Sequence, residues 1–159
     1  MNKFKTKFES IFNSLPKSSE ILLCIGEIDC RLNSGIILHS NKHPEKNISH
    51  LITSTINNYL RYILKINNCS EHNIIIQGVP CPNIDTKELS NKKLALLIDV
   101  VKRFNIELKN TSKKMGFGYL DVYKLTNRGD GLSNDIWHLD NHHLSPEGMQ
   151  KAWKEYAFY

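Results

Sequence analysis

The stretch Ile21-Leu-Leu-Cys-Ile25 is a continuous apolar run that ends at Gly26. A run this short suits a strand that is buried on both faces, as in a parallel sheet. Two similar runs follow it in the chain, at residues 73–79 (Asn-Ile-Ile-Ile-Gln-Gly-Val) and at residues 119–122 (Tyr-Leu-Asp-Val). We therefore expect three short strands that belong to one sheet.

Helical patterns alternate with these strands. Residues 3–14 carry apolar side chains at helical spacing, and Pro16 ends that helix. Further helices are expected from Ser49, from Ser90 and over residues 146–157, whereas residues 32–48 read as an irregular loop because they are polar and contain Pro44. The order α-β-α-β-α-β-α predicts an α/β fold with a short parallel sheet, right-handed crossovers and helices on both faces.

The composition is that of an ordinary globular protein, and 159 residues predict one domain over residues 1–159. No apolar run approaches the roughly 18 residues of a membrane span. The net charge of +5 comes with scattered lysines, which favours solubility over nucleic-acid binding. The four cysteines form no Cys-x-x-Cys pair, so we expect reduced, mostly buried thiols in a cytoplasmic protein that needs no cofactor.

Three segments follow the three predicted strands, and ligand sites of parallel α/β folds lie at this end of the sheet. They are residues 26–31 (Gly-Glu-Ile-Asp-Cys-Arg), residues 78–82 and residues 135–148. The last segment is the richest in polar groups, and Ser145 and Pro146 then provide the cap and first turn of a helix. Its imidazoles and carboxylates come from Asp135, His138, Asp140, His142 and His143.

These segments resemble the SGNH/GDSL hydrolase superfamily over roughly residues 20–157. The family's last motif is Asp-x-x-His before the final helix, often continued by Leu-Ser-x-x-Gly, and the chain has Asp140-Asn-His-His-Leu-Ser-Pro-Glu-Gly148. Gly26-Glu-Ile-Asp29 corresponds to the family's Gly-x-Asn-Asp loop. The longer string Gly-Glu-Ile-Asp-Cys-Arg is similar to a subset of SGNH-like proteins found near carbohydrate-related genes.

The resemblance implies a three-layer, flavodoxin-like fold and an esterase or acyltransferase that acts on a small-molecule or carbohydrate ester. His143 would be the general base and Asp140 the acid that orients it. Asp135 and His138 have the same spacing and form the alternative pair. Gly26 would belong to the loop that binds the oxyanion.

Glu27, Asp29 and Arg31 would line the pocket, with Arg31 paired either to Asp29 or to a substrate carboxylate. An ion pair that only shapes this loop is the competing interpretation. Cys30 is disfavoured as a substitute nucleophile, because the family places its nucleophile on a different strand.

Two departures from the family pattern stand out. No Gly-Asp-Ser block with a nucleophilic serine is present, and Ile28 replaces the asparagine that would donate to the oxyanion. The chain therefore looks like the C-terminal two-thirds of such a domain. In the family's strand order, residues 21–25 would form an open edge, which we expect to be covered by a second copy of this chain, by a separate polypeptide or by the N-terminal helix.

Two other functions compete with ester chemistry. The polar segment from Asp135 to His143 contains enough ligand types for a divalent metal, but neighbouring imidazoles point in different directions, and we expect no metal. The stronger alternative is a binding or assembly module without turnover, which keeps the fold and uses its open sheet edge to hold a partner.

Overall fold

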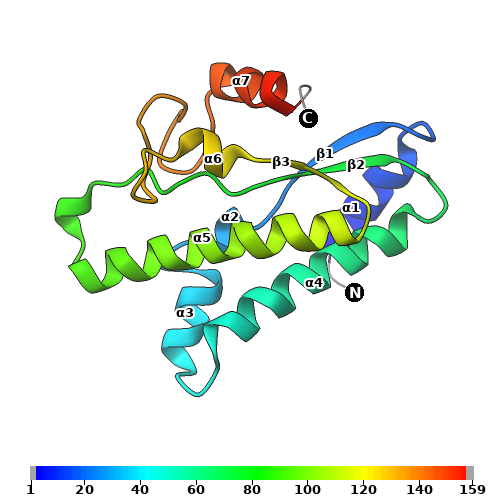
Figure 1. Cartoon of the computed structure of the whole chain (residues 1–159). Helices are drawn as coiled ribbons and strands as arrows, with labels where there is room; N and C mark the ends of the chain where they lie inside the picture. Colours follow the sequence, from blue (N-terminus) through cyan, green and yellow to red (C-terminus); the bar gives the residue numbers. More distant parts are fainter. Residues whose placement is uncertain (1–2, 157–159) are drawn as a thin grey trace.

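The computed structural model describes residues 3–156. Its helices and strands alternate along the chain, with the carboxyl ends of the strands on one side and the loop before α7 at that same side (Figure 1). In chain order the elements are α1 (Lys3–Ser14), β1 (Glu20–Cys24), α2 (Glu27–Cys30), α3 (Gly35–Lys42), α4 (Ile48–Asn67), β2 (Asn73–Gln77), η1 (Thr86–Glu88), α5 (Asn91–Lys114), β3 (Gly118–Leu120), α6 (Val122–Thr126) and α7 (Pro146–Tyr156).

The sheet has the order β1-β2-β3, and both pairings are parallel. Leu22 lies opposite Ile75, and Ile76 lies opposite Tyr119. The central strand β2 is buried over Ile74–Gln77, whereas most of β1 is only partly buried. This confirms the three predicted parallel strands and places the most buried of them in the middle.

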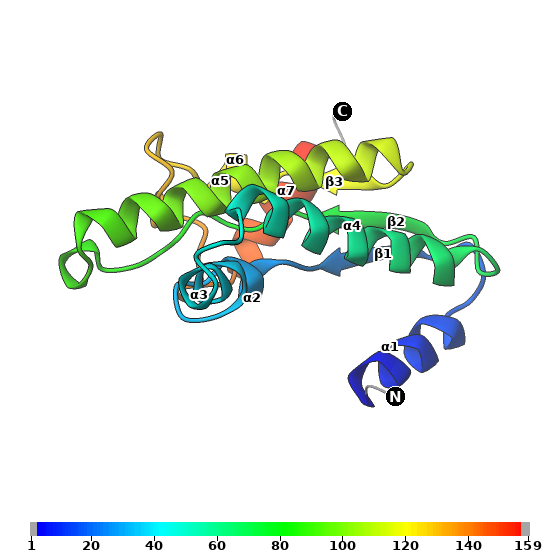
Figure 2. The same ribbon diagram turned by 90° about the horizontal axis from the view of Figure 1, so that it is seen from below.

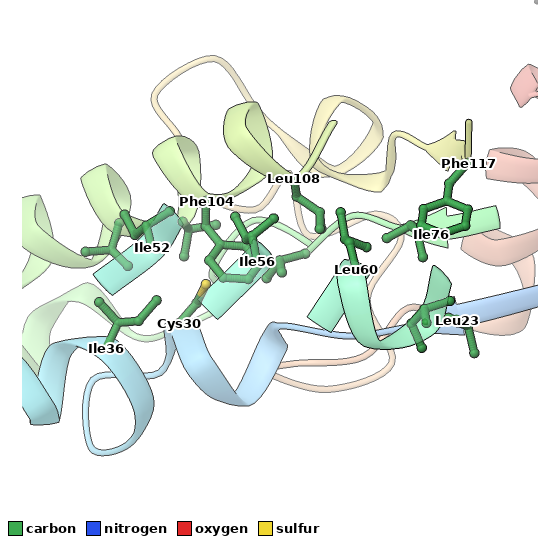
Figure 3. Close-up of a cluster of buried hydrophobic side chains, with 14 of the residues drawn as sticks. Leu23, Cys30, Ile36, Ile52, Ile56, Leu60, Ile76, Phe104, Leu108 and Phe117 are labelled. Carbon is green, nitrogen blue, oxygen red and sulfur yellow. The ribbon is translucent and has the colours of Figure 1, made fainter. Parts of the chain in front are cut away.

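Helices cover both faces of the sheet (Figure 2). On one face α4 and α5 pack against the sheet and against each other, and the side chains of this larger core point toward one another in Figure 3. On the other face α7 covers a smaller cluster built around Ile75, Leu120 and Ala152. The expected three-layer α/β architecture is thus confirmed.

The expectation of an irregular loop over residues 32–48 is wrong, because α3 forms there. Ile36 and Ile37 are buried in the main core, which stabilises a helix that the polar composition hides. Pro44 does not prevent this helix but follows its end: His43 has left the helical conformation, as a residue before proline tends to do.

Two further short helices, α2 and α6, follow β1 and β3 directly. The third strand is consequently shorter than predicted, since Asp121 caps α6 by accepting a hydrogen bond from the Lys124 N–H. The other helices agree closely with the sequence prediction. Asn47 caps α4 and Ser90 caps α5. Residue 157, which the sequence placed in the last helix, lies outside the described residues.

β1 is an edge strand, because within residues 3–156 it pairs only with β2. α1 lies beyond this edge, near the start of β1 (Figure 2). Its contacts are mainly with α4 and with the loop before β2: Phe8 packs near Tyr62, and Phe12 meets the ring of His72 edge-on. The strand's hydrogen-bonding groups on the outer side are therefore unpaired in the described part of the chain.

The cysteines depart from one expectation. All four are free, but only Cys30 and Cys81 are buried, whereas Cys24 and Cys69 are exposed. In the described residues no helix is both long enough and apolar enough to cross a bilayer.

Asn105 ties the exit of β2 to α5. Its Oδ1 accepts hydrogen bonds from the Val79 N–H at 2.8 Å and the Tyr119 hydroxyl at 3.0 Å. Its Nδ2 donates to the carbonyl groups of Val79 and Val101. Asn105 is buried, so these bonds satisfy backbone groups that water does not reach.

Replacing Asn105 with alanine is expected to lower the free energy of unfolding by about 3 kcal/mol, because several buried polar groups lose their partner at once. Urea denaturation followed by circular dichroism measures this. Asn58→Ala, at an exposed position of α4, is the matched control and should change stability by less than about 0.5 kcal/mol. Equal effects of the two substitutions would contradict the role of Asn105.

Candidate functional site

The candidate site lies where the three strands end. β1 leads through Gly26 into α2, β2 leads into residues 78–82, and α6 leads into a long loop over residues 127–145 that returns beside them. Backbone and side-chain hydrogen bonds hold this loop to the β2 exit: the Ser133 N–H donates to the Pro82 carbonyl, and Asn83 donates to the carbonyl of Asp140. The three segments that the sequence predicted to meet do lie together.

Asp140 and His143 form a close pair within one turn. The Oδ1 of Asp140 accepts from the backbone N–H groups of His142 and His143 at 2.7 and 2.8 Å, and Nδ1 of His143 lies 2.8 Å from Oδ2. The hydrogen bond from the His143 ring, followed by those two N–H groups, lowers the pKa of Asp140 well below its usual value. Asp140 is therefore an ionised acceptor that holds the imidazole by Nδ1.

A second imidazole, His142, is held by a carboxylate from a different element. Its Nδ1 lies 2.9 Å from Oε1 of Glu27 on α2. Arg31 donates two hydrogen bonds to the same carboxylate, from Nε at 2.7 Å and from an Nη at 2.6 Å. Glu27, Arg31 and His142 were all candidates from the sequence, but the contact between Glu27 and His142 was not predicted, because no local spacing indicates a contact between residues so far apart in the chain.

One of the two partners expected for Arg31 is wrong: Arg31 pairs with Glu27 and not with Asp29, as an ion pair that shapes this loop would. The four-residue spacing on α2 places Glu27 and Arg31 on the same side of that helix, whereas a residue two positions away points elsewhere. Asp29 instead accepts a hydrogen bond from the Tyr59 hydroxyl of α4 at 2.9 Å. Burial raises the pKa of Asp29, and the hydrogen bond from Tyr59 opposes this rise.

Gly26 needs to be a glycine. Its φ of 95° lies in the left-handed region, and a Cβ here would collide with the Phe104 ring. This close approach packs the start of α2 against the main core, so the position of Glu27 is fixed by the packing beneath it.

The alternative pair, Asp135 and His138, is not brought together by a hydrogen bond. Nε2 of His138 lies 3.0 Å from the Cys81 carbonyl, to which it must donate. Its Nδ1 then accepts from the Ser133 hydroxyl at 2.8 Å, and Ser133 in turn accepts from the Asp135 N–H. Both ring nitrogens of His138 are occupied, so this residue fastens the loop to the exit of β2.

Two open cavities adjoin the paired histidines. One of about 450 Å³ lies between α2, the β2 exit and α5, with Val79, Leu97 and Val101 on its apolar side. The other, of about 560 Å³, contains His143, Tyr59 and the end of β1. Glu27, Pro80 and His142 line both cavities, so the Glu27–His142 pair stands on the border between them.

No described serine or threonine donates a hydrogen bond to His142 or His143. Ser34, which lines the smaller cavity, donates to the Ile28 carbonyl. Cys24 lines the larger cavity, but its thiol donates to Gln77, and desolvation raises its pKa. Burial raises the pKa of the Cys30 thiol further. Neither thiol is thus disposed to act as a thiolate nucleophile.

His, Cys, Asp and Glu side chains do not gather in residues 3–156 into a group of three that could hold a metal ion. The imidazoles of His142 and His143 are 6.4 Å apart between ring centroids and nearly perpendicular, and each is turned toward its own carboxylate. The polar groups of the site therefore form two separate histidine–carboxylate pairs.

Comparison with known proteins supports the fold. A scan against protein families and a search of curated proteins find no match. Among solved structures, the chain resembles phospholipase A1 from Streptomyces albidoflavus NA297, with a TM-score of 0.53 and 13% sequence identity. The match covers 94% of this chain and 74% of that one. At this identity the likeness shows the fold alone, and that fold agrees with the three-layer α/β architecture expected from the sequence.

The pH dependence of stability tests the role of His138. Burial lowers its pKa in the folded protein, whereas the unfolded chain has the ordinary value of about 6.5. As the pH falls below this value, the unfolded state binds a proton that the folded state resists, so the free energy of unfolding falls. His138→Gln removes this contribution.

The melting temperature of His138→Gln should therefore fall less than that of the unaltered protein between about pH 7.5 and about pH 5.5. The variant should also melt lower at the upper pH, since the hydrogen bonds to Cys81 and Ser133 are altered. His50→Gln, at an exposed position on α4, is the control and should keep the full pH slope. If the melting temperatures of all three proteins change equally with pH, the role assigned to His138 is wrong.

Proposed function

We propose that this chain is an SGNH-like ester hydrolase or acyltransferase domain that acts on an ester of a small molecule or a carbohydrate. The observation that carries the proposal is the Asp140–His143 pair, which its own turn fixes and whose His143 lines a cavity at the carboxyl ends of parallel strands. The fold shared with a phospholipase A1 adds support, since that protein is an ester hydrolase by name.

His143 is the general base in this proposal. Because its Nδ1–H donates to Asp140, protons are gained and lost at Nε2, which no described residue engages by a hydrogen bond. Nε2 takes the proton from a hydroxyl that attacks the ester carbonyl. Asp140 holds the tautomer and stabilises the imidazolium that forms.

The attacking hydroxyl comes from outside the described residues: water, an acceptor alcohol or a serine of another polypeptide. Backbone N–H groups of the loop at Gly26 would stabilise the oxyanion, because the exposed side chain of Ile28 cannot donate. Glu27, Asp29 and Arg31 shape the wall that the substrate meets.

A binding or assembly module without turnover is the second candidate. It is favoured by the lack of a hydroxyl partner for His143 in the described residues and by the unpaired edge of β1. That edge would accept a strand from a second copy of this chain or from a complementing polypeptide.

Hydrolysis of p-nitrophenyl acetate separates these candidates. The purified protein is expected to release p-nitrophenol faster than buffer, and His143→Asn should lower kcat/KM by about 100-fold or more, the usual contribution of a general base. Asp140→Asn should lower it in the same direction, since the imidazole loses its charged anchor.

His50→Asn is the control for unspecific catalysis by surface imidazoles, and it should retain the activity of the unaltered protein. Turnover that His143→Asn leaves intact would refute the role of the pair. No turnover above buffer would favour the binding module.

A further inference from the structure

Glu27 contacts His142 in the same way as Asp140 contacts His143. In both pairs a carboxylate oxygen lies within 2.9 Å of Nδ1, which leaves Nε2 as the position where protons exchange. The two imidazoles are neighbours in sequence, yet their anchors come from opposite ends of the chain.

Glu27 is a firm anchor. Its side chain is 25% exposed, two hydrogen bonds from Arg31 fix it, and α2 rests on the core beneath Gly26. The backbone N–H of His142 is fixed in turn by Asp140. The ring is therefore restrained from both sides, and no described residue forms a hydrogen bond with its Nε2.

The place of His142 distinguishes it from His143. His143 lines only the larger cavity, whereas His142 lines both. An ester has two halves, acyl and alcohol, and a substrate that fills both cavities puts the bond between its halves at their border. His142 is the imidazole next to that border.

We propose that His142, oriented by Glu27 and Arg31, is the general acid that protonates the departing alcohol, while His143 acts as the base on the attacking hydroxyl. This inference rests on the ester chemistry proposed above. It makes His142 a catalytic residue and makes Glu27 and Arg31 positioning residues.

In hydrolysis, the two imidazoles act in sequence. Nε2 of neutral His143 removes a proton from water as the water oxygen bonds to the carbonyl carbon. The carbon–oxygen bond to the alcohol half then breaks, and its electron pair goes to the alcohol oxygen, which takes the proton from Nε2 of the His142 imidazolium. The products are the acid and the alcohol, and solvent returns a proton from His143 to His142.

Esters with different leaving groups test the proposal. A p-nitrophenolate departs without a proton at neutral pH, whereas an alkoxide needs one. His142→Asn should therefore lower kcat/KM for an ethyl ester about 100-fold more than for the p-nitrophenyl ester of the same acid. His143→Asn should lower both by similar factors, because both reactions need the base.

The positioning residues need a readout that a merely structural role would not move. Glu27→Ala should change the same ratio of ethyl to p-nitrophenyl activity, and Glu27→Gln, which still offers an oxygen to Nδ1, should restore part of it. ¹⁵N NMR of the neutral His142 ring should show the Nδ1–H tautomer in the unaltered protein and a shift toward Nε2–H in Glu27→Ala.

Each outcome bears on one of the two proposals. If the unaltered protein cleaves p-nitrophenyl esters but His142→Asn leaves the ratio unchanged, the acid role is overturned and the esterase stands. A His142 ring in the Nε2–H tautomer overturns the acid role whatever the activity. If neither ester is cleaved, hydrolysis with water as the nucleophile fails, and the acid role proposed for that step fails with it.

Discussion

The parallel pairing of β2 with both of its neighbours is the constraint on which the site depends. β2 is buried between β1 and β3, and both pairings are parallel. The crossovers through α4 and α5 therefore bring the chain back to the amino ends of the strands, so that every strand ends at the same edge of the sheet. Everything that follows a strand is thereby delivered to one edge. Segments as distant in sequence as α2 and the loop over residues 127–145 become neighbours only through this arrangement.

Packing and hydrogen bonds then fix the positions of these neighbouring segments. Gly26 allows α2 to sit against Phe104, and Asn105, on the same helix, fixes the exit of β2 by its hydrogen bonds to Val79. His138 fastens the third segment to that exit through Cys81. Three contacts with the core therefore hold the polar site in position. Each is made by a residue that carries no charge at neutral pH in this arrangement.

The predictable parts of the molecule are those set by local pattern. Apolar runs and helical spacing indicated the three strands and four of the helices, and the turn from Asp140 to His143 was visible as a motif. The helix α3 shows the limit, since its apolar residues, among them the buried Ile36 and Ile37, lie within a stretch that is otherwise mostly polar. The link from Glu27 to His142 was out of reach for a different reason: it depends on the register of the sheet and on loop length, which one sequence does not encode in any local spacing.

The difference between local and long-range contacts also bears on the proposed base, His143, which is positioned independently of any nucleophile. Asp140 is held by the backbone of its own turn and holds His143 three residues on, so this pair needs only a few residues and the start of α7. The pair of Glu27 and His142 spans two elements and requires the sheet. Because the two histidine–carboxylate pairs are anchored independently, the proposed base stays in position whichever molecule supplies the attacking oxygen.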